Sequence, residues 1–516
     1  MEILGLIDVP WWILWPLAIV LSFIGYCLYY QTSLKRRGIP GPTPKWIMGN
    51  MKDLIEEGVY GSDRRYAETY GRYCSFYFGN HPVIMVFDPE IIHEITIAQF
   101  SKFYNRGDTV IPTERWQNSI NNAKGSKWKY LRSVIQPAFS SAKIKVMSPI
   151  IRKSFDELLS ILNNNVGEEI DISERYSALT MDVICTTAFG IEVNSQKNKE
   201  DPFVKHASKV LGVGLTNYVL MLNFIFPTPF IRKIIMRITG DWTDRKAMDF
   251  LTQTVKQAIE MRMKDSSVDY HDLLKLMMDT QMNTNGEHGI SVNKTFEQMK
   301  QDGMSDEDIV INGIIMLAAG YDTTSSLLTW ITYYLALYPD HQVRLYEEIQ
   351  QIVGTNHRDV TFDDIMKMEF LEMFMQETLR LKSPAGRFNR QPKVDVEIKG
   401  LKFKKGDDIT IGTHGIHSNP LYWPDPDKFD PERFAPENKH KIIPYSYLPF
   451  GAGPRNCVGM KLALAEAKMV IVHLLQRMRV LKSSKFTDPP KMRSGGGLLR
   501  IDGGLWVKLE SRQTIP

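Results

Sequence analysis

The sequence is poor in several features that mark particular classes of protein. Among its 516 residues are only 4 cysteines, Cys27, Cys74, Cys185 and Cys457, and no two of them form a Cys-x-x-Cys pair. Cysteines this few and scattered exclude a disulfide framework and a cysteine-based zinc site, and free thiols agree with a reducing compartment. The sequence also has no Gly-rich dinucleotide motif and no P-loop. These motifs therefore give no sign that the chain itself binds a dinucleotide or a nucleoside triphosphate.

An excess of charge of one sign is also missing. The chain has 63 Lys+Arg and 59 Asp+Glu, a net charge of only +4. A nucleic-acid-binding protein would carry a basic excess on one face, so we expect no nucleic-acid partner. Hydrophobic residues make up 43% of the chain and charged residues 24%. This composition excludes disordered and collagen-like chains and is typical of a protein with a large buried core.

One long uncharged run is present, at the N-terminus. Residues 9–34 carry no charge, Asp8 precedes them, and the basic residues Lys35, Arg36 and Arg37 follow. About 26 helical residues would span ~39 Å, more than the ~30 Å hydrocarbon core of a bilayer. Tryptophans near its start and tyrosines near its end resemble interfacial aromatic belts. We therefore predict a single-pass anchor over residues 1–34, and the basic triplet predicts a cytoplasmic body.

A cleaved signal peptide is the alternative for this run. It would need a basic first segment and a small-residue cleavage site, whereas this chain begins with Glu2 and Asp8. Residues 35–50 follow as a basic and Pro-rich linker, because prolines cannot continue the helix. Residues 51–516 are predicted to form one catalytic domain, mainly α with a minor β part. Apolar spacing is mostly helical over about 127–382, and short alternating runs begin at Val394.

The strongest local signal is a cysteine loop at residues 450–459, followed by a predicted helix from Met460. The glycines before and after Cys457 are expected to allow close backbone approach and positive φ. A cysteine just ahead of a helix meets unpaired N–H groups and the positive end of the helix dipole, and Arg455 adds a cation. All three favour thiolate, which is one known ligand of haem iron. A buried inert cysteine, the alternative, would not require this framing.

The loop resembles a known signature. The pattern Phe-x-x-Gly-x-Arg-x-Cys-x-Gly is filled by Phe450, Gly453, Arg455, Cys457 and Gly459, and it is similar to the haem-binding signature of the cytochrome P450 monooxygenases. The resemblance extends over essentially the whole chain and looks closest to the microsomal, drug- and steroid-oxidising branch. It implies the cytochrome P450 fold, a helical haem domain plus small sheets. It also implies haem b as cofactor and Cys457 as the ligand of its iron.

A second motif of the family is Glu-x-x-Arg, matched by Glu377 and Arg380. Residues at i and i+3 share one helix face, so these two can pair. Arg433, in Pro431-Glu432-Arg433-Phe434, stands where the family has a third member. The resemblance implies that a buried Glu377 lies between the two arginines and supports the haem loop.

Further residues resemble the family's propionate ligands. Trp128 and Arg132 match Trp-x-x-x-Arg, and their i,i+4 spacing turns both side chains the same way. In the family this pair donates to a haem propionate, a carboxylate that suits the fork of arginine. Arg106, Arg390 and Arg455 stand where the family places other propionate partners. For each single arginine, and for Arg106 in particular, a solvated surface charge is the alternative.

The apolar stretch of residues 314–330 is interrupted by Asp322, Thr323 and Thr324. Gly320 in mid-helix lowers stability by about 1 kcal/mol relative to Ala, and we expect that its missing side chain lets a ligand approach. The stretch is similar to the family's Ala/Gly-Gly-x-Asp/Glu-Thr motif, whose acid and alcohol deliver protons during oxygen activation. Asp322 and Thr323 are thus the candidate catalytic residues, with Thr324 as a substitute hydroxyl. An N-cap-like Asp-Thr in a broken helix is the alternative.

The resemblance implies an anchored enzyme of the endoplasmic reticulum membrane that inserts one atom of O2 into apolar small molecules of the steroid, fatty acid or xenobiotic class. Electrons would come from NADPH-cytochrome P450 reductase, with cytochrome b5 as an optional second donor. A basic surface near Cys457 would suit docking, with Lys441, Arg132 and Lys143 as candidates. A haem-thiolate isomerase or dehydratase without reductase and a non-catalytic haem protein are the alternatives. The Asp322–Thr323 pair speaks against both.

Overall fold

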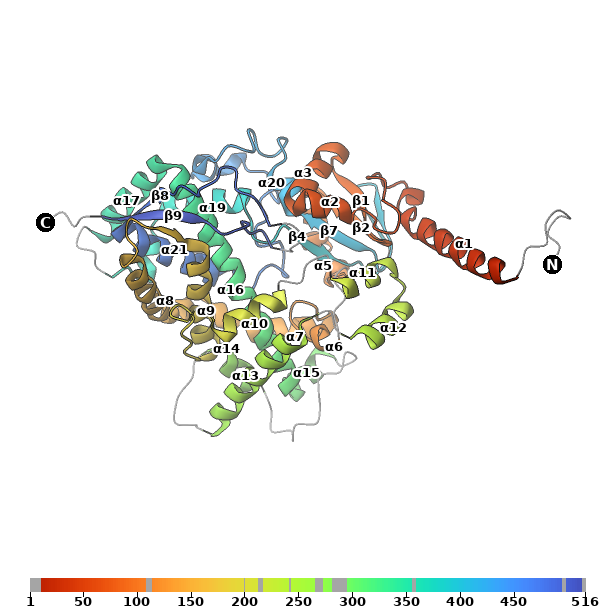
Figure 1. Cartoon of the computed structure of the whole chain (residues 1–516), viewed down its shortest axis with the longest axis horizontal. Coiled ribbons are helices and arrows are strands. Elements are labelled where there is room, and N and C mark those ends of the chain that lie inside the picture. The colour runs from red at the N-terminus through yellow and green to blue at the C-terminus, as the bar shows by residue number, and fades with distance from the viewer. Residues whose placement is uncertain are drawn as a thin grey trace.

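The computed structural model describes residues 11–107, 114–198, 200–211, 217–240, 243–264, 272–280, 295–354, 359–493 and 498–512. Within them the chain is mainly helical with small sheets, which confirms the predicted fold class (Figure 1). Residues 1–10 of the predicted anchor lie outside the described residues.

The α-helices are, in chain order, α1 (Trp11–Gln31), α2 (Met51–Glu56), α3 (Gly58–Tyr70), α4 (Pro89–His93), α5 (Phe100–Phe103), α6 (Glu114–Gln117), α7 (Gly125–Ile135), α8 (Ser141–Asn163), α9 (Ile172–Phe189), α10 (Pro202–Leu211), α11 (Tyr218–Ile225), α12 (Pro229–Thr239), α13 (Arg245–Lys264), α14 (Leu273–Met278), α15 (Phe296–Asp302), α16 (Asp306–Leu337), α17 (Pro339–Val353), α18 (Phe362–Ile365), α19 (Glu369–Leu381), α20 (Thr413–His417) and α21 (Met460–Arg477). Shorter helical turns are η1 (Lys35–Arg37), η2 (Glu94–Ala98), η3 (Gln136–Phe139), η4 (Pro431–Phe434) and η5 (Lys439–Lys441). The strands are β1 (Tyr73–Phe78), β2 (His81–Val86), β3 (Glu169–Asp171), β4 (Arg387–Arg390), β5 (Val396–Ile398), β6 (Leu401–Phe403), β7 (Asp408–Gly412), β8 (Met478–Lys482) and β9 (Trp506–Ser511).

Helix α1 extends away from the body at the end that carries β1 and β2 (Figure 1). Among the described residues it is the one helix long and apolar enough to cross a membrane, over Trp12–Gln31 with mean hydropathy 1.8. Its 21 residues would be about 31 Å long, close to the thickness of a bilayer core. The segment that follows lies against the body. Ile39 is buried, and the carbonyl of Pro40 accepts the backbone N–H of Ser75 at 2.6 Å.

The strands form three small sheets within the described part of the chain. The largest has the order β1-β2-β7-β4, with β2 and β7 parallel and the other neighbours antiparallel. Strands β3, β9 and β8 form the second sheet, and β5 and β6 the third. The first sheet carries Arg390 at the end of β4, and so fixes one residue of the candidate site.

Helix α16 runs through the helical core and packs along α9. It begins with a capping box of Ser305 and Asp308 and has acidic residues in its first turn, both of which stabilise a helix N-terminus. It is helical at every residue between its ends, so the broken-helix alternative is wrong. A Cβ on Gly320 would lie 2.8 Å from Cδ1 of Ile184 on α9. A side chain at Gly320 would therefore press on α9, so helix packing is one reason for glycine here, and the expectation that it admits a ligand remains a prediction.

Candidate functional site

The cysteine loop immediately precedes α21. The backbone N–H of Cys457 donates to the carbonyl of Phe450 at 2.9 Å, which closes the loop. Gly453 has φ +75°, and a Cβ there would lie 2.0 Å from the carbonyl oxygen of Thr96, so both conformation and space require glycine. Gly459 has φ −86°, which any residue can adopt. The expected positive φ is therefore found before the cysteine and not at Gly459.

The thiol of Cys457 is exposed, whereas the other three cysteines are buried. It lines a hollow of about 820 Å³ between its loop and α7. Although Cys457 reaches the surface of this hollow, its thiol is largely surrounded by protein, and this desolvation raises the pKa of Cys457. The backbone N–H of Gly459 opposes the rise most, followed by the Arg132 and Arg106 side chains and the backbone N–H of Met460. The predicted effect of the helix start is thus present. The cations that favour the thiolate are Arg132 and Arg106, and not Arg455 as the sequence suggested.

Four arginines from distant parts of the chain gather near this loop. Arg390 is 0% exposed and Arg455 is 3% exposed. Burial lowers the pKa of Arg106 to about 10, of Arg390 to about 9 and of Arg455 to about 8, and in each case another guanidinium of the group adds to the effect. Burial also lowers the pKa of Arg132. Like charges held together out of water require a compensating anion.

The described residues supply only neutral partners for this cluster. None of the four arginines has a carboxylate partner among them, and the Nε atoms of Arg106, Arg390 and Arg455 have no hydrogen-bond partner there. Arg132 donates to the backbone carbonyl and the side-chain oxygen of Asn456, and Arg106 donates to the side-chain oxygen of Asn121. Arg390 donates to the carbonyls of Asn389 and Ala452. Arg455 donates to the carbonyls of Tyr104, Asn121 and Ala123. A ligand with two carboxylates, such as haem with its propionates, fits this donor set.

Trp128 and Arg132 lie one turn apart on α7, as their spacing predicts. Trp128 is buried, and the Arg455 guanidinium lies over its ring at 4.9 Å. Phe100 meets the same ring edge-on at 5.8 Å between centroids. An aromatic wall thus lies beside the cationic cluster.

Glu377 lies between Arg380 and Arg433. Arg380 donates from Nε and Nη2 to both carboxylate oxygens at 2.7 Å, and Nε of Arg433 is 3.4 Å from Oε1. The backbone N–H of Asp430 donates to the same oxygen at 2.9 Å. Burial raises the pKa of Glu377, and the bonds from Arg380 oppose that rise most. Arg380 also donates to the carbonyl of His417 at 2.8 Å, so the group ties α19 to the segments before the cysteine loop.

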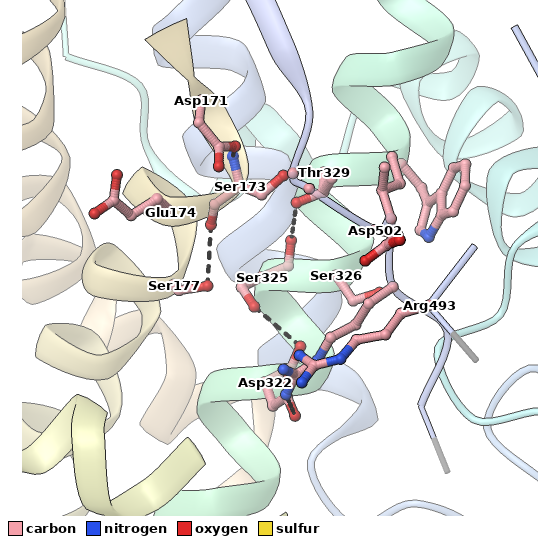
Figure 2. Close-up of a pocket in the computed structure, with 15 residues that line it drawn as sticks. Asp171, Ser173, Glu174, Ser177, Asp322, Ser325, Ser326, Thr329, Arg493 and Asp502 are labelled. Carbon is pink, nitrogen blue, oxygen red and sulfur yellow. Dashed lines mark hydrogen bonds and ion pairs between the residues drawn. The ribbon is translucent and has the colours of Figure 1, made fainter. Parts of the chain in front are cut away.

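Asp322 and Thr323 lie on different sides of α16. The Thr323 hydroxyl donates to the carbonyl of Ala319 at 2.8 Å, and Ala319 is exposed in a stretch that is otherwise mostly buried. Asp322 is buried and faces a polar pocket (Figure 2). Its carboxylate forms an ion pair with Arg500. Burial raises the pKa of Asp322, and Arg500 is the main opposing influence. The sequence carries no signal for Arg500, which is 178 residues away.

Comparison with known proteins agrees with this geometry. The sequence model of the family described as Cytochrome P450 matches residues 39–508. The chain is 34% identical to cytochrome P450 3A13 of Mus musculus over 515 residues, 99% of each chain. It is 35% identical to cytochrome P450 3A18 of Rattus norvegicus, covering 99% of this chain and 100% of the relative, and 34% identical to cytochrome P450 3A7 of Homo sapiens, covering 99% of each. The chain therefore belongs to the cytochrome P450 family and is a monooxygenase of the haem-iron type.

Proposed function

We propose that the protein is a membrane-anchored haem-thiolate monooxygenase. It inserts one atom of O2 into apolar small molecules, with electrons from NADPH-cytochrome P450 reductase. The observation that carries the proposal is the cluster of four guanidinium groups without carboxylate partners among the described residues, beside Cys457. Arg390 and Arg455 are buried, and Arg106 and Arg132 are partly buried. That combination fits haem b, which presents two propionates and an iron atom on one ligand.

Each residue has a distinct role in this proposal. Cys457 ligates the iron, and the loop from Phe450 through Gly453 to Gly459 shapes its approach. Arg106, Trp128, Arg132, Arg390 and Arg455 hold the propionates, and Glu377 with Arg380 and Arg433 supports the loop from behind. When bound, thiolate-ligated haem supplies the activation of O2. Asp322 holds a proton at its carboxylate, and the hydroxyl of Thr323, or of Thr324, moves protons on the substrate side.

Contacts between α1 and the body support a second membrane contact. The hydroxyls of Tyr26 and Tyr30 lie 3.3 and 3.2 Å from Oγ1 of Thr228, directly before α12. Along one face of α12, Phe230, Ile234 and Ile238 are exposed. An exposed apolar stripe next to a membrane-spanning helix suits insertion into the same bilayer surface. We infer that α1 anchors the chain in the endoplasmic reticulum membrane as a single pass, with the body cytoplasmic.

The hollow beside Cys457 suits an electron-donating partner. Its lining includes Lys129, Arg132 and Lys461, and Lys129 and Lys461 are exposed. Lys441 is exposed as well, whereas Lys143 is half-buried. A basic surface next to the iron ligand would steer an acidic reductase or cytochrome b5 toward the site. The substrate class rests on the relatives, which are cytochromes P450 3A, and we propose steroids, fatty acids or xenobiotics.

A carbon monoxide difference spectrum of membranes carrying the full chain tests the haem ligand. A strongly red-shifted Soret band in wild type and its loss in Cys457→Ala are expected, and the same band in both proteins would overturn the assignment. Reductase-dependent NADPH consumption coupled to an oxygenated product then tests the reaction. Product without reductase would instead indicate an isomerase or dehydratase, and haem binding without product a non-catalytic protein.

A further inference from the structure

Lys382, the residue that follows α19, places its amine in a niche between two aromatic rings. Its Nζ lies 4.4 Å from the centroid of the Tyr60 ring on α3 and 5.2 Å from that of the Trp330 ring on α16. The helices around the niche pack together, since α19 contacts α16 and α20, and α20 contacts α3 (Figure 1). Lys382 is half-buried, so its side chain is partly withdrawn from water but still within reach of small molecules.

No acceptor in the described part of the chain neutralises this amine. The Lys382 side chain forms no hydrogen bond and no ion pair there. The two carboxylates that act on it are bonded elsewhere, because Asp427 accepts from Arg64 at 2.9 Å and Asp488 accepts from the hydroxyl of Tyr333. Both acids are exposed, so water and salt weaken their attraction for the ammonium. Within the described residues the amine is therefore held by ring faces and by no oxygen atom.

The surroundings of Lys382 favour its neutral form. Burial lowers the pKa of Lys382 to about 8 from the ordinary 10.5, and Asp427 and Asp488 oppose this only in part. Burial also raises the pKa of Tyr60 and lowers that of His414 on α20 to about 3, so neither residue supplies a charge at neutral pH. At pH 7.4 about a fifth of the Lys382 amines are then neutral, against about one in a thousand for an ordinary lysine. A neutral lysine amine is a nucleophile toward carbonyl compounds.

We propose that Lys382 is a covalent-modification site that forms an imine with small, apolar aldehydes. The lone pair of Nζ attacks the carbonyl carbon, and a proton moves from the nitrogen to the oxygen. The resulting carbinolamine loses water and leaves a C=N double bond, so the step consumes no oxidant and no reductant. This inference goes beyond the proposed function and needs neither haem turnover nor reductase.

The niche favours an apolar aldehyde for two reasons. The ring faces of Tyr60 and Trp330 can pack against an apolar substituent on the carbonyl carbon, which removes that substituent from water. A neutral imine also no longer carries the cost of withdrawing an ammonium group from water.

The experiment uses the full-length, haem-loaded chain in phosphatidylcholine vesicles, whose headgroups carry no primary amine. Propanal is added with cyanoborohydride, which reduces each imine to a stable propylamine, and the labelled lysines are followed over time by peptide mass spectrometry. Lys485 is the control within the same molecule, because its Nζ lies 3.8 Å from the centroid of the Trp506 ring while the residue is exposed. We expect Lys382 to be labelled about tenfold faster than Lys485 at pH 7.4, although it is less exposed.

The pH profile of labelling is a second readout. The rate at Lys382 should level off above about pH 8, where an ordinary lysine still gains reactivity. Tyr60→Ala opens one wall of the niche to water, so the rate should level off at a higher pH, whereas Tyr60→Phe keeps the ring and should match wild type. Both variants are first checked for an unchanged haem spectrum. If Lys382 reacted no faster than Lys485 at pH 7.4, or if its rate rose through pH 8 without levelling off, the inference would be overturned.

Discussion

A buried glutamate on α21 makes the stability of the fold depend on pH in a predictable way. Glu466 lies in the second turn of the helix that follows the cysteine loop, is 4% exposed, and its Oε1 has no hydrogen-bond partner among the described residues. Burial raises its pKa to about 8 from the ordinary 4.5. The folded protein therefore keeps this proton over a pH range in which the unfolded chain has lost it.

The sign and size of the effect follow from proton linkage. Because the folded state binds more protons between pH 4.5 and pH 8, the free energy of unfolding falls as the pH rises through this window. The contribution is complete below pH 4.5 and fully lost above pH 8. One pKa unit corresponds to about 1.4 kcal/mol, so the loss between pH 5 and pH 8 is about 3.5 kcal/mol. For a chain of this length that is a change of about 3 °C in the thermal midpoint.

Glu466→Gln keeps the shape of the side chain and removes the titration. We expect thermal midpoints of the haem-loaded variant, measured at half-unit steps from pH 5 to pH 8, to decline less than those of wild type by about 3 °C over the window. The comparison is between slopes, so a constant effect of burying the amide cancels. Glu432→Gln, at an exposed glutamate, serves as the control and should keep the wild-type slope. Parallel curves for Glu466→Gln and wild type would refute a protonated buried Glu466.

Three further outcomes are expected. Glu377→Gln should lower the free energy of unfolding by about 3–5 kcal/mol in denaturant titrations, because it leaves the buried Arg380 and the largely buried Arg433 without their carboxylate. Glu432→Gln, which removes the exposed ion pair with Arg344, should change it by about 0–1 kcal/mol. Equal effects of the two substitutions would contradict the supporting role of Glu377. Haem dimethyl ester lacks both propionate charges, so it cannot form charge-assisted bonds to the arginine cluster. It should therefore dissociate from the protein about 10–100-fold faster than haem, measured by transfer to apomyoglobin. Equal rates for the two would show that the arginine cluster binds something else. His473 stacks on Phe155, and burial lowers its pKa to about 3 from the ordinary 6.5. Between pH 6.5 and pH 5 wild type should therefore lose about 1.6 kcal/mol of stability relative to His473→Phe, which has no such titration. Unfolding free energies of both proteins at both pH values check the difference, and an unchanged difference would contradict a neutral buried His473.

The parts of the site that the sequence predicted are those with short spacing. Glu377 and Arg380 are three residues apart on one helix, and Trp128 and Arg132 are four apart, so helix geometry alone brings each pair together. The cysteine loop combines glycines, an arginine and a helix start within ten residues. Contacts within so short a stretch depend on local conformation, which the sequence pattern specifies directly.

Contacts between distant segments were predicted less well, for physical reasons. The sequence placed Arg455 nearest to the thiol because it is two residues from Cys457, but that side chain turns toward the carbonyls of Tyr104, Asn121 and Ala123. Arg132, 324 residues from its partner Asn456, is one of the two cations that act on the thiol. Gly320 is explained by Ile184 on α9, and helix packing of this kind leaves no periodic signal in either helix.

The pairing of Asp322 with Arg500 shows how the two kinds of information combine. The motif on α16 specifies an acid and an alcohol side by side, but adjacent helical positions face different directions. Only the fold shows that the acid side is a solvent-connected polar pocket and that its counter-charge comes from the C-terminal segment.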